Sequence, residues 1–318
     1  MSFKPQLEPH TQKFIDSLAG STPIETLPPN EARNVLAGAQ KSVAYNLPAA
    51  VEEVNFPVGP TGKVLVKIVR PENASGTLHP ILYMHGGGWI LGDREVFDRH
   101  ARAMATGANA AVFFVEYDRS PEAKYPTAIE QGYAVGEYIS NNAQKFNVDA
   151  SKLVVAGDSV GGNMTGAISL MAKERGGFKI TLTVQFYPVT SAKLDTESYK
   201  TYAGGPWLTK PMMEWFWNAY APEASQREAH TASLLNATTD QLKGLPEALI
   251  ITAENDVLRD EGEEYGRRLA QAGVRVTQTR YLSTIHDFVL LNPIYETPAA
   301  RGATAQACQH IRAHFSQQ

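Results

Sequence analysis

The sequence contains a single cysteine and no long apolar run. Cys308 cannot form a disulfide within the chain, and alone it cannot supply a zinc site built from cysteine ligands. No stretch approaches the roughly 18 uninterrupted apolar residues that a membrane span requires. The first ten residues, MSFKPQLEPH, contain no apolar signal region. We therefore expect a cytoplasmic protein that does not span a membrane.

Positive charge is not in excess either. The chain has 29 Lys and Arg against 33 Asp and Glu, which gives a net charge of −4 at pH 7. Since no basic stripe is present, nucleic acid is not expected as a partner. Hydrophobic residues make up 43% of the 318 positions, which is ordinary for a globular protein and provides enough apolar side chains for a large core.

Short runs of β-branched or aromatic residues alternate with segments whose apolar residues recur at helical spacing. The predicted strands are residues 81–84, 111–117, 152–156, 182–187, 248–252 and 275–281. The predicted helices are residues 96–106, 128–142, 162–175 and 261–272. Such alternation indicates an α/β fold with a mostly parallel sheet covered by helices on both faces. Two earlier runs, 53–58 and 63–69, flank a Gly-Pro-Thr-Gly turn and predict an antiparallel hairpin.

Two regions interrupt this alternation. Residues 1–48 have helical patterns but no strand, and residues 192–235 form a long insertion rich in Trp, Met and Phe. We interpret the first as the N-terminal part of a helical cap and the second as a cap insertion, above the end of the sheet where ligands bind in open α/β folds. Residues 49–191 and 236–318 are then the two parts of the core.

A candidate nucleophile lies between a predicted strand and a predicted helix. Residues 157–161 read Gly-Asp-Ser-Val-Gly, a pattern that places Ser159 on a sharp strand-to-helix turn. Glycines flank such a turn because side chains there would collide with neighbouring backbone. The start of the following helix directs backbone N–H groups toward a developing negative charge. A connecting turn with an incidental serine is the alternative interpretation of this pattern.

A glycine-rich loop directly follows the strand 81–84. Its sequence, His-Gly-Gly-Gly-Trp at 85–89, is the lipase and esterase pattern that provides a second set of oxyanion donors. We assign the backbone N–H groups of Gly87, Gly88 and Val160 to an oxyanion hole. A phosphate-binding loop is disfavoured because no Lys-Ser/Thr follows. We interpret His85 as a residue that orients this loop rather than as a catalytic base.

A base and an acidic partner are expected after the serine, in the order Ser, Asp or Glu, His. His286 follows the last predicted strand in a short loop, 282–288, and is our candidate base. Asp256 follows the strand 248–252 and precedes His286 by 30 residues, which fits one helix plus one strand. The other carboxylates are less suitable as the acidic partner, because Glu254 is too close to its strand and Asp260 suits a helix N-cap. The other histidines are less suitable as the base. His230 lies in the predicted cap, and His310 and His314 are expected on a solvated helix face.

Asp287 directly follows the candidate base. A neighbour in sequence cannot readily orient the imidazole, but its negative charge favours the imidazolium form and raises the pKa of His286. We therefore expect activity to rise with pH through the neutral range and to level off in mild alkali.

Taken together, these residues resemble the bacterial hormone-sensitive lipase-like esterases, which have the α/β-hydrolase fold. The resemblance covers about two-thirds of the chain and rests on 85–89 with 92–93, 116–122 with 125–126, 157–162, 187–188, 256–262 and 286–288. It implies an eight-stranded core with a two-part helical cap, no cofactor, and frequent dimers. It also implies Ser159, Asp256 and His286 as the triad, with Gly87, Gly88 and Val160 as oxyanion donors.

The chain departs from that family pattern without losing a reacting group. Val160 stands where the family usually has Ala, Val257 where it has Pro, and Asp287 where it has Gly. The run 119–122 is also altered. These departures bear on substrate preference, because they change the surroundings of the reacting groups.

The expected activity is that of a serine carboxylesterase acting on small-molecule esters of short to medium acyl chain through an acyl-enzyme. An amidase, lactonase or thioesterase would use the same groups, and a non-catalytic ligand receptor would lack one of them. A metal site at His85 and Asp93 has no ligand spacing to support it, so no metal is expected, and the resemblance implies no cofactor. Trp89, Trp207, Met212 and Phe216 are candidate pocket residues. A homodimer is a candidate assembly, with 275–281 as an edge strand that pairs across it.

Overall fold

The computed structural model describes residues 5–43, 45 and 47–316. Its centre is a sheet of eight strands in the order β1-β2-β4-β3-β5-β6-β7-β8. The strands are β1 Ala49–Phe56, β2 Val64–Pro71, β3 Pro80–Met84, β4 Ala111–Glu116, β5 Leu153–Asp158, β6 Ile180–Phe186, β7 Glu247–Asn255 and β8 Val276–Ile285. Every predicted strand therefore exists, and the α/β class is confirmed.

The direction of the strands also follows the prediction. β1 pairs antiparallel with β2, and β2 pairs antiparallel with β4. The other neighbours, from β4 through β3 to β8, are all parallel. β3 and β5 are fully buried, as expected of parallel strands covered on both faces. β8 forms one edge of the sheet, which is the position that the dimer hypothesis assumed, and the dimer itself stays a prediction.

β8 is longer than predicted, and this corrects the loop before His286. The strand continues to Ile285, which pairs with Asn255 of β7 beyond an irregularity in the ladder. The loop expected at 282–288 therefore begins at His286 itself. The paired strand ends bring Asp256 and His286 side by side, because each directly follows the last paired residue of its strand.

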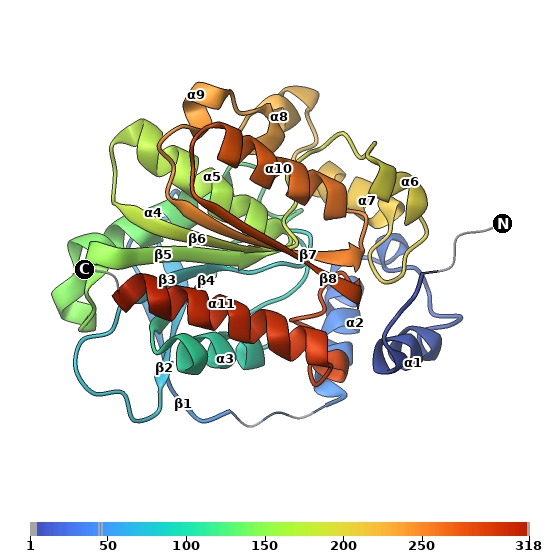
Figure 1. Cartoon of the computed structure of the whole chain (residues 1–318), viewed down its shortest axis with the longest axis horizontal. Coiled ribbons are helices and arrows are strands. Elements are labelled where there is room, and N and C mark those ends of the chain that lie inside the picture. Colours follow the sequence, from blue (N-terminus) through green and yellow to red (C-terminus); the bar gives the residue numbers. More distant parts are fainter. Residues whose placement is uncertain (1–4, 44, 46, 317–318) are drawn as a thin grey trace.

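Helices cover both faces of the sheet (Figure 1). α3 and α11 lie on one face, and α4, α5 and α10 lie on the other. Their bounds are α3 Asp98–Ala108, α4 Thr127–Asn141, α5 Val160–Arg175, α10 Arg259–Gln271 and α11 Pro298–Ser316. The residues of α5 from Val160 to Ala172 are all buried, because this helix packs against several strands at the centre of the molecule.

A cap of helices lies at the end of the sheet toward which the strands of the parallel part point (Figure 1). It comprises α1 Pro9–Ser17, α2 Pro29–Lys41, α6 Glu197–Thr201 and α7 Lys210–Tyr220. α7 begins at Lys210, where the Thr209 hydroxyl accepts the N–H of Met212 and Pro211 stands in the first turn. Both segments expected to form a cap, near the N-terminus and in the insertion, contribute to it.

The second half of the insertion lies elsewhere. α8 Ala224–Glu228 is placed beside α9 Thr239–Leu242, above α5 and α10 (Figure 1). Asn163 of α5 donates its side-chain N–H to the carbonyl of Ala232. The insertion predicted at 192–235 therefore covers the end of the sheet only with its first part, because its last residues are fixed to the helical layer of the core.

Candidate active site

Ser159 lies at the turn between β5 and α5 with φ of 55° and ψ of −120°. This is a strained conformation for a residue with a side chain, and the neighbours explain how it is held. A Cβ atom on Gly157 would lie 2.4 Å from the backbone of Gly161, and one on Gly161 would lie 2.0 Å from the carbonyl oxygen of Met84. The two glycines are thus required by close backbone approach, as the sequence predicted.

His286 connects the serine to a carboxylate. Its Nε2 atom lies 2.9 Å from Ser159 Oγ, and its Nδ1 atom lies 2.7 Å from Asp256 Oδ2. All three side chains are buried. The other oxygen of Asp256 accepts the N–H of Leu258 at 2.9 Å, which fixes the carboxylate. This arrangement has Nδ1–H donating to Asp256, so that Nε2 is left to accept the serine proton.

The other candidates form separate contacts. His230 pairs with Glu174 at 2.7 Å, and His310 pairs with Glu247 at 2.9 Å. The expectation of a solvated face at the C-terminal helix is wrong for His314, which is buried and bonded to Thr181. His310 and His314 are four residues apart, a spacing that puts two side chains on the same face of a helix. The spacing does not say whether that face is buried or exposed.

The two rejected carboxylates also have structural partners. Glu254 accepts the N–H of Ser283 at 2.6 Å, next to the end of β8. Asp260 is not the N-cap of α10, which is Leu258, and the predicted cap is therefore wrong. Asp260 lies in the first turn of α10. Its carboxylate accepts the N–H of Ser198, a residue of α6 in the helical cap above the sheet, at 2.7 Å. The N-cap lies two residues before Asp260, where Asp256 accepts the N–H of Leu258.

The glycine loop after β3 faces the serine. Gly87 and Gly88 have positive φ angles of 92° and 62°. Both line the same cavity as Ser159 and His286. Among the hydrogen bonds within the described residues, none uses the N–H of Gly87 or Gly88. These two donors, with Val160 at the start of α5, are therefore available to an oxygen bound beside Ser159.

His85 holds this loop in place. It is fully buried, its Nδ1 atom lies 2.8 Å from the carbonyl oxygen of Gly86, and its ring stacks on Tyr117 at 4.1 Å. Burial lowers the pKa of His85 to about 3, so the imidazole is neutral and Nδ1 donates to the carbonyl. The geometry agrees with the interpretation of His85 as an orienting residue. Over the described ranges, no three His, Cys, Asp or Glu side chains group as metal ligands would.

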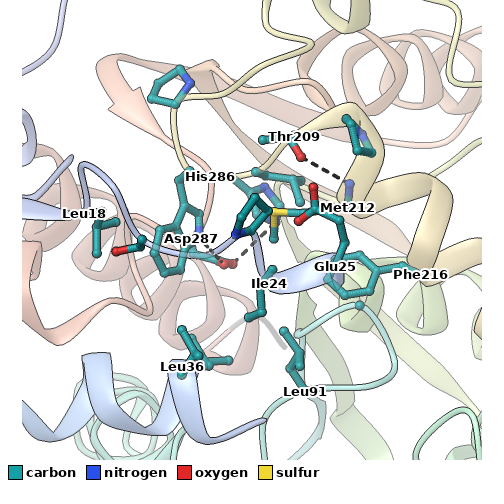
Figure 2. Close-up of a pocket in the computed structure, with 18 of the residues that line it drawn as sticks. Leu18, Ile24, Glu25, Leu36, Leu91, Thr209, Met212, Phe216, His286 and Asp287 are labelled. Carbon is teal, nitrogen blue, oxygen red and sulfur yellow. Dashed lines mark hydrogen bonds and ion pairs between the residues drawn. The ribbon is translucent and has the colours of Figure 1, made fainter. Parts of the chain in front are cut away.

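A cavity of about 580 Å³ extends from Ser159 into the cap (Figure 2). Of the predicted pocket residues, Trp207, Met212 and Phe216 line it. Trp89 does not, which corrects the prediction. Its ring is fully buried and stacks on Tyr220 at 4.0 Å, so it packs the cap onto the core instead.

The opposite wall of the cavity comes from the N-terminal region, where the sequence predicts part of the cap but no particular pocket residue. This wall consists of side chains from α1, α2 and the segment between them, and the apolar ones are Ile15, Leu18, Ala19, Ile24, Val35 and Leu36. Figure 2 shows Leu18, Ile24 and Leu36 around the space below His286. Their apolar helical spacing was visible in the sequence, but it is equally typical of side chains that pack against a core.

Asp287 also lines the cavity and contacts two side chains named as site candidates, His286 and Trp207. Its Oδ1 atom lies 3.4 Å from His286 Nε2, and its Oδ2 atom accepts the indole N–H of Trp207 at 2.8 Å. Burial opposes the imidazolium form of His286, but the charges of Asp256 and Asp287 outweigh it and raise the pKa of His286 to about 9. Asp287 thereby connects His286 to Trp207 of the cap.

Comparison with known proteins places this geometry in a family. Residues 81–290 match the family model described as the alpha/beta hydrolase fold. The chain is a member of the α/β-hydrolase family. Its resemblance to the hormone-sensitive lipase-like esterases, which rested on motifs within the same range, is thereby confirmed.

Named relatives cover most of the chain. It is 38% identical to the alpha/beta hydrolase R526 of Acanthamoeba polyphaga mimivirus over 93% of this chain and 84% of that protein. It is 35% identical to the carboxylesterase NlhH of Mycobacterium tuberculosis over 78% and 77% of the two chains.

Solved structures of esterases match the whole chain. A thermostable esterase from Pseudomonas putida ECU1011 is 44% identical, with a TM-score of 0.97 over 100% of both chains. A fungal esterase from Rhizomucor miehei is 35% identical, with a TM-score of 0.92 over 98% of both chains. Within the described residues of this α/β-hydrolase, no helix combines the length and apolarity needed to cross a membrane.

Proposed function

We propose that the protein is a serine carboxylesterase that hydrolyses small esters of short to medium acyl chain through an acyl-enzyme. The observation that carries this proposal is the continuous contact from Ser159 Oγ through His286 to Asp256 at the floor of an apolar cavity. The names of the relatives as esterases and carboxylesterases support the same reaction class.

The reaction begins with proton transfer from Ser159 to Nε2 of His286 while Oγ attacks the ester carbonyl carbon. Asp256 holds the imidazole in the tautomer that accepts this proton and stabilises the cation that forms. His286 then gives the proton to the departing alcohol. Water attacks the acyl-enzyme in the second half, with His286 again acting first as base and then as acid.

Negative charge on the carbonyl oxygen is stabilised by fixed backbone donors. The N–H groups of Gly87, Gly88 and Val160 supply these donors, and the positive end of α5 adds to them. Removal of one such donor typically costs about 3 kcal/mol of transition-state stabilisation. Gly87 and Gly88 adopt positive φ angles and have no side chain, so an oxygen in the cavity can approach their backbone closely.

The cavity limits the length of the acyl chain. Its apolar walls suit hydrocarbon, and its volume of about 580 Å³ lies in the range of small-molecule sites rather than extended lipid surfaces. Because α1, α2, α7 and the segments that flank these helices supply most of the lining, a long chain would have to displace them. We therefore expect maximal kcat/KM at short to medium chains.

The test is pre-steady-state hydrolysis of p-nitrophenyl butyrate by the wild type and by Ser159→Ala. The wild type is expected to release a burst of nitrophenolate equal to the enzyme concentration, and the variant none. A series of acyl lengths from acetate to palmitate then locates the optimum. Equal inertness of both proteins on the whole series would contradict the proposal and favour a ligand receptor, whereas preference for emulsified long-chain triglycerides would contradict the size limit alone.

A further inference from the structure

Asp158 is a buried carboxyl group directly before the nucleophile, and the reaction above does not use it. It is the last residue of β5 and only 1% exposed. Its Oδ1 atom accepts two hydrogen bonds, from the Tyr83 hydroxyl at 2.7 Å and from the backbone N–H of Gly86 at 3.1 Å. Burial of a carboxyl group costs folding free energy, so we ask what these two contacts contribute to function.

The contact with Gly86 fixes the start of the oxyanion loop. Asp158 holds the N–H of Gly86, while the carbonyl of Gly86 accepts from His85 Nδ1 at 2.8 Å and from the Tyr117 hydroxyl at 3.4 Å. The peptide groups on both sides of Gly86 are thus held by buried side chains. Gly87, the first proposed oxyanion donor, is the next residue along the chain.

The space between the loop and the nucleophile turn leaves little freedom for another arrangement. A Cβ atom on Gly86 would lie 2.2 Å from Asp158 Oδ2. A Cβ atom on Gly161, on the other side of Ser159, would meet the carbonyl oxygen of Met84 just before the loop. The carboxyl group of Asp158 therefore fills the gap between two backbone segments that carry Ser159 and the oxyanion donors.

We propose that Asp158 is a positioning residue, which sets the distance between Ser159 Oγ and the N–H groups of Gly87 and Gly88 by holding Gly86. This inference rests on the proposed esterase function and deepens it. Oxyanion donors act at about 2.7–3.1 Å from the oxygen they stabilise, and a misplacement of about 1 Å costs on the order of 100-fold in rate.

Protonation does not remove this contact. Burial raises the pKa of Asp158 to about 7, with the charge of Asp287 adding to the effect. A proton is accommodated on Oδ2, which has no hydrogen-bond partner among the described residues, while Oδ1 continues to accept from Tyr83 and Gly86. The role of Asp158 is therefore one of geometry in both ionisation states.

The experiment compares Asp158→Asn, Asp158→Ala and Asp158→Leu. Asn keeps an acceptor at Oδ1, whereas Ala and Leu both remove it. Leu also fills the space that Ala leaves empty, so the test does not depend on whether the Ala variant folds. The measured quantities are kcat per active site titrated with a phosphonate, KM for p-nitrophenyl butyrate, and the inhibition constant of a trifluoromethyl ketone that mimics the tetrahedral intermediate.

We expect Asn to retain kcat within about fivefold. Ala and Leu should lose about 10- to 100-fold in kcat at nearly constant KM, and their affinity for the ketone should fall by the same factor. Glu261→Ala is the matched control, because Glu261 is an equally buried carboxyl group that accepts two backbone N–H groups, those of Thr190 and Ser191, away from the oxyanion loop. It should lower the melting temperature without lowering kcat per titrated site.

Three results would overturn the inference: an unchanged kcat per titrated site in both Ala and Leu, an equal loss in Glu261→Ala, or a loss of kcat without a loss of ketone affinity. A wild type that is as inert as Ser159→Ala on the whole ester series would instead overturn the proposed function, so the two failures are distinguishable.

Discussion

The two sides of the cavity that contains Ser159 and His286 are built differently. The floor consists of residues at the carboxyl ends of parallel strands, where Ser159, Asp256 and His286 each follow the end of a strand. The roof consists of apolar side chains from α1, α2, α7 and the segments that flank these helices, and they come from two distant parts of the chain. The floor requires particular atoms at particular distances, whereas the roof requires only apolar volume. The floor should therefore be intolerant of single substitutions, and the roof should respond with changes in substrate preference.

The largest effect is expected at the floor, for Asp256→Asn. The amide can donate to Nδ1 of His286 and so favours the tautomer with the proton on Nε2, which cannot accept from Ser159. We expect kcat to fall about 10⁴-fold with little change in KM, as for the same change in other triads. Steady-state kinetics with p-nitrophenyl butyrate measure this. A loss below tenfold would show that Asp256 does not orient the base, and circular dichroism serves to check the fold.

The next largest loss of kcat is expected for Gly88→Ala, where the glycine loop of the floor contacts α7 of the roof. A Cβ atom on Gly88 would lie 2.2 Å from the ring of Phe216 in α7. Gly88→Ala should therefore both strain a positive φ and displace an oxyanion donor, for an expected loss of about 10²–10³-fold in kcat.

Addition of Phe216→Ala separates these two causes. The double variant removes the clash but keeps the strain, so it should recover at least tenfold of the lost kcat. The single variant Phe216→Ala is the control. If kcat does not recover in the double variant, glycine is required at position 88 because of its positive φ angle and not because of its contact with Phe216 of the cap.

The same contrast explains how much the sequence could predict. The floor could be located because Gly-x-Ser-x-Gly, the glycine loop and the chain order of Ser159, Asp256 and His286 each reflect a local backbone requirement. The roof could not, because Leu18 and Leu36 occur at the same apolar helical spacing as core residues, and α7, which lines the same cavity, begins 174 residues after Leu36. Trp89 was misassigned for the same reason, since a large aromatic side chain beside the glycine loop suits a pocket as well as a packed interface.

A smaller effect is expected in the roof, for Leu18→Trp. Leu18 lines the cavity opposite Met212, and a larger ring there would shorten the space for the acyl chain (Figure 2). We expect kcat/KM for the octanoate ester to fall about tenfold relative to the acetate ester, with the acetate rate near that of the wild type. Val51→Trp, at an exposed site on β1, is the matched control. A uniform loss on both esters would show that Leu18 supports the fold rather than chain-length selection.

The smallest effect is expected at Asp287, where floor and roof are connected through charge. With the pKa of His286 raised to about 9, the base is mostly protonated at pH 7, and kcat/KM should rise with pH toward a plateau above that value. Asp287→Asn removes a negative charge 3.4 Å from Nε2 but keeps an oxygen for the indole of Trp207. The imidazolium form loses stabilisation, so the pKa of His286 should fall by about one unit. The rising limb then moves to lower pH, and activity at pH 7 should increase several-fold.

Glu25→Gln distinguishes this local effect from a general one, because Glu25 also lines the cavity but has no contact with His286 among the hydrogen bonds and ion pairs of the described residues. Its pH profile should match that of the wild type. If Asp287→Asn leaves the limb in place, or if Glu25→Gln moves it as far, the charge of Asp287 does not set the pKa of the base. The role of Asp287 would then be limited to accepting the indole N–H of Trp207, which ties the cap to the loop of His286. The floor would still tolerate fewer substitutions than the roof, but the charge of Asp287 would not link the two.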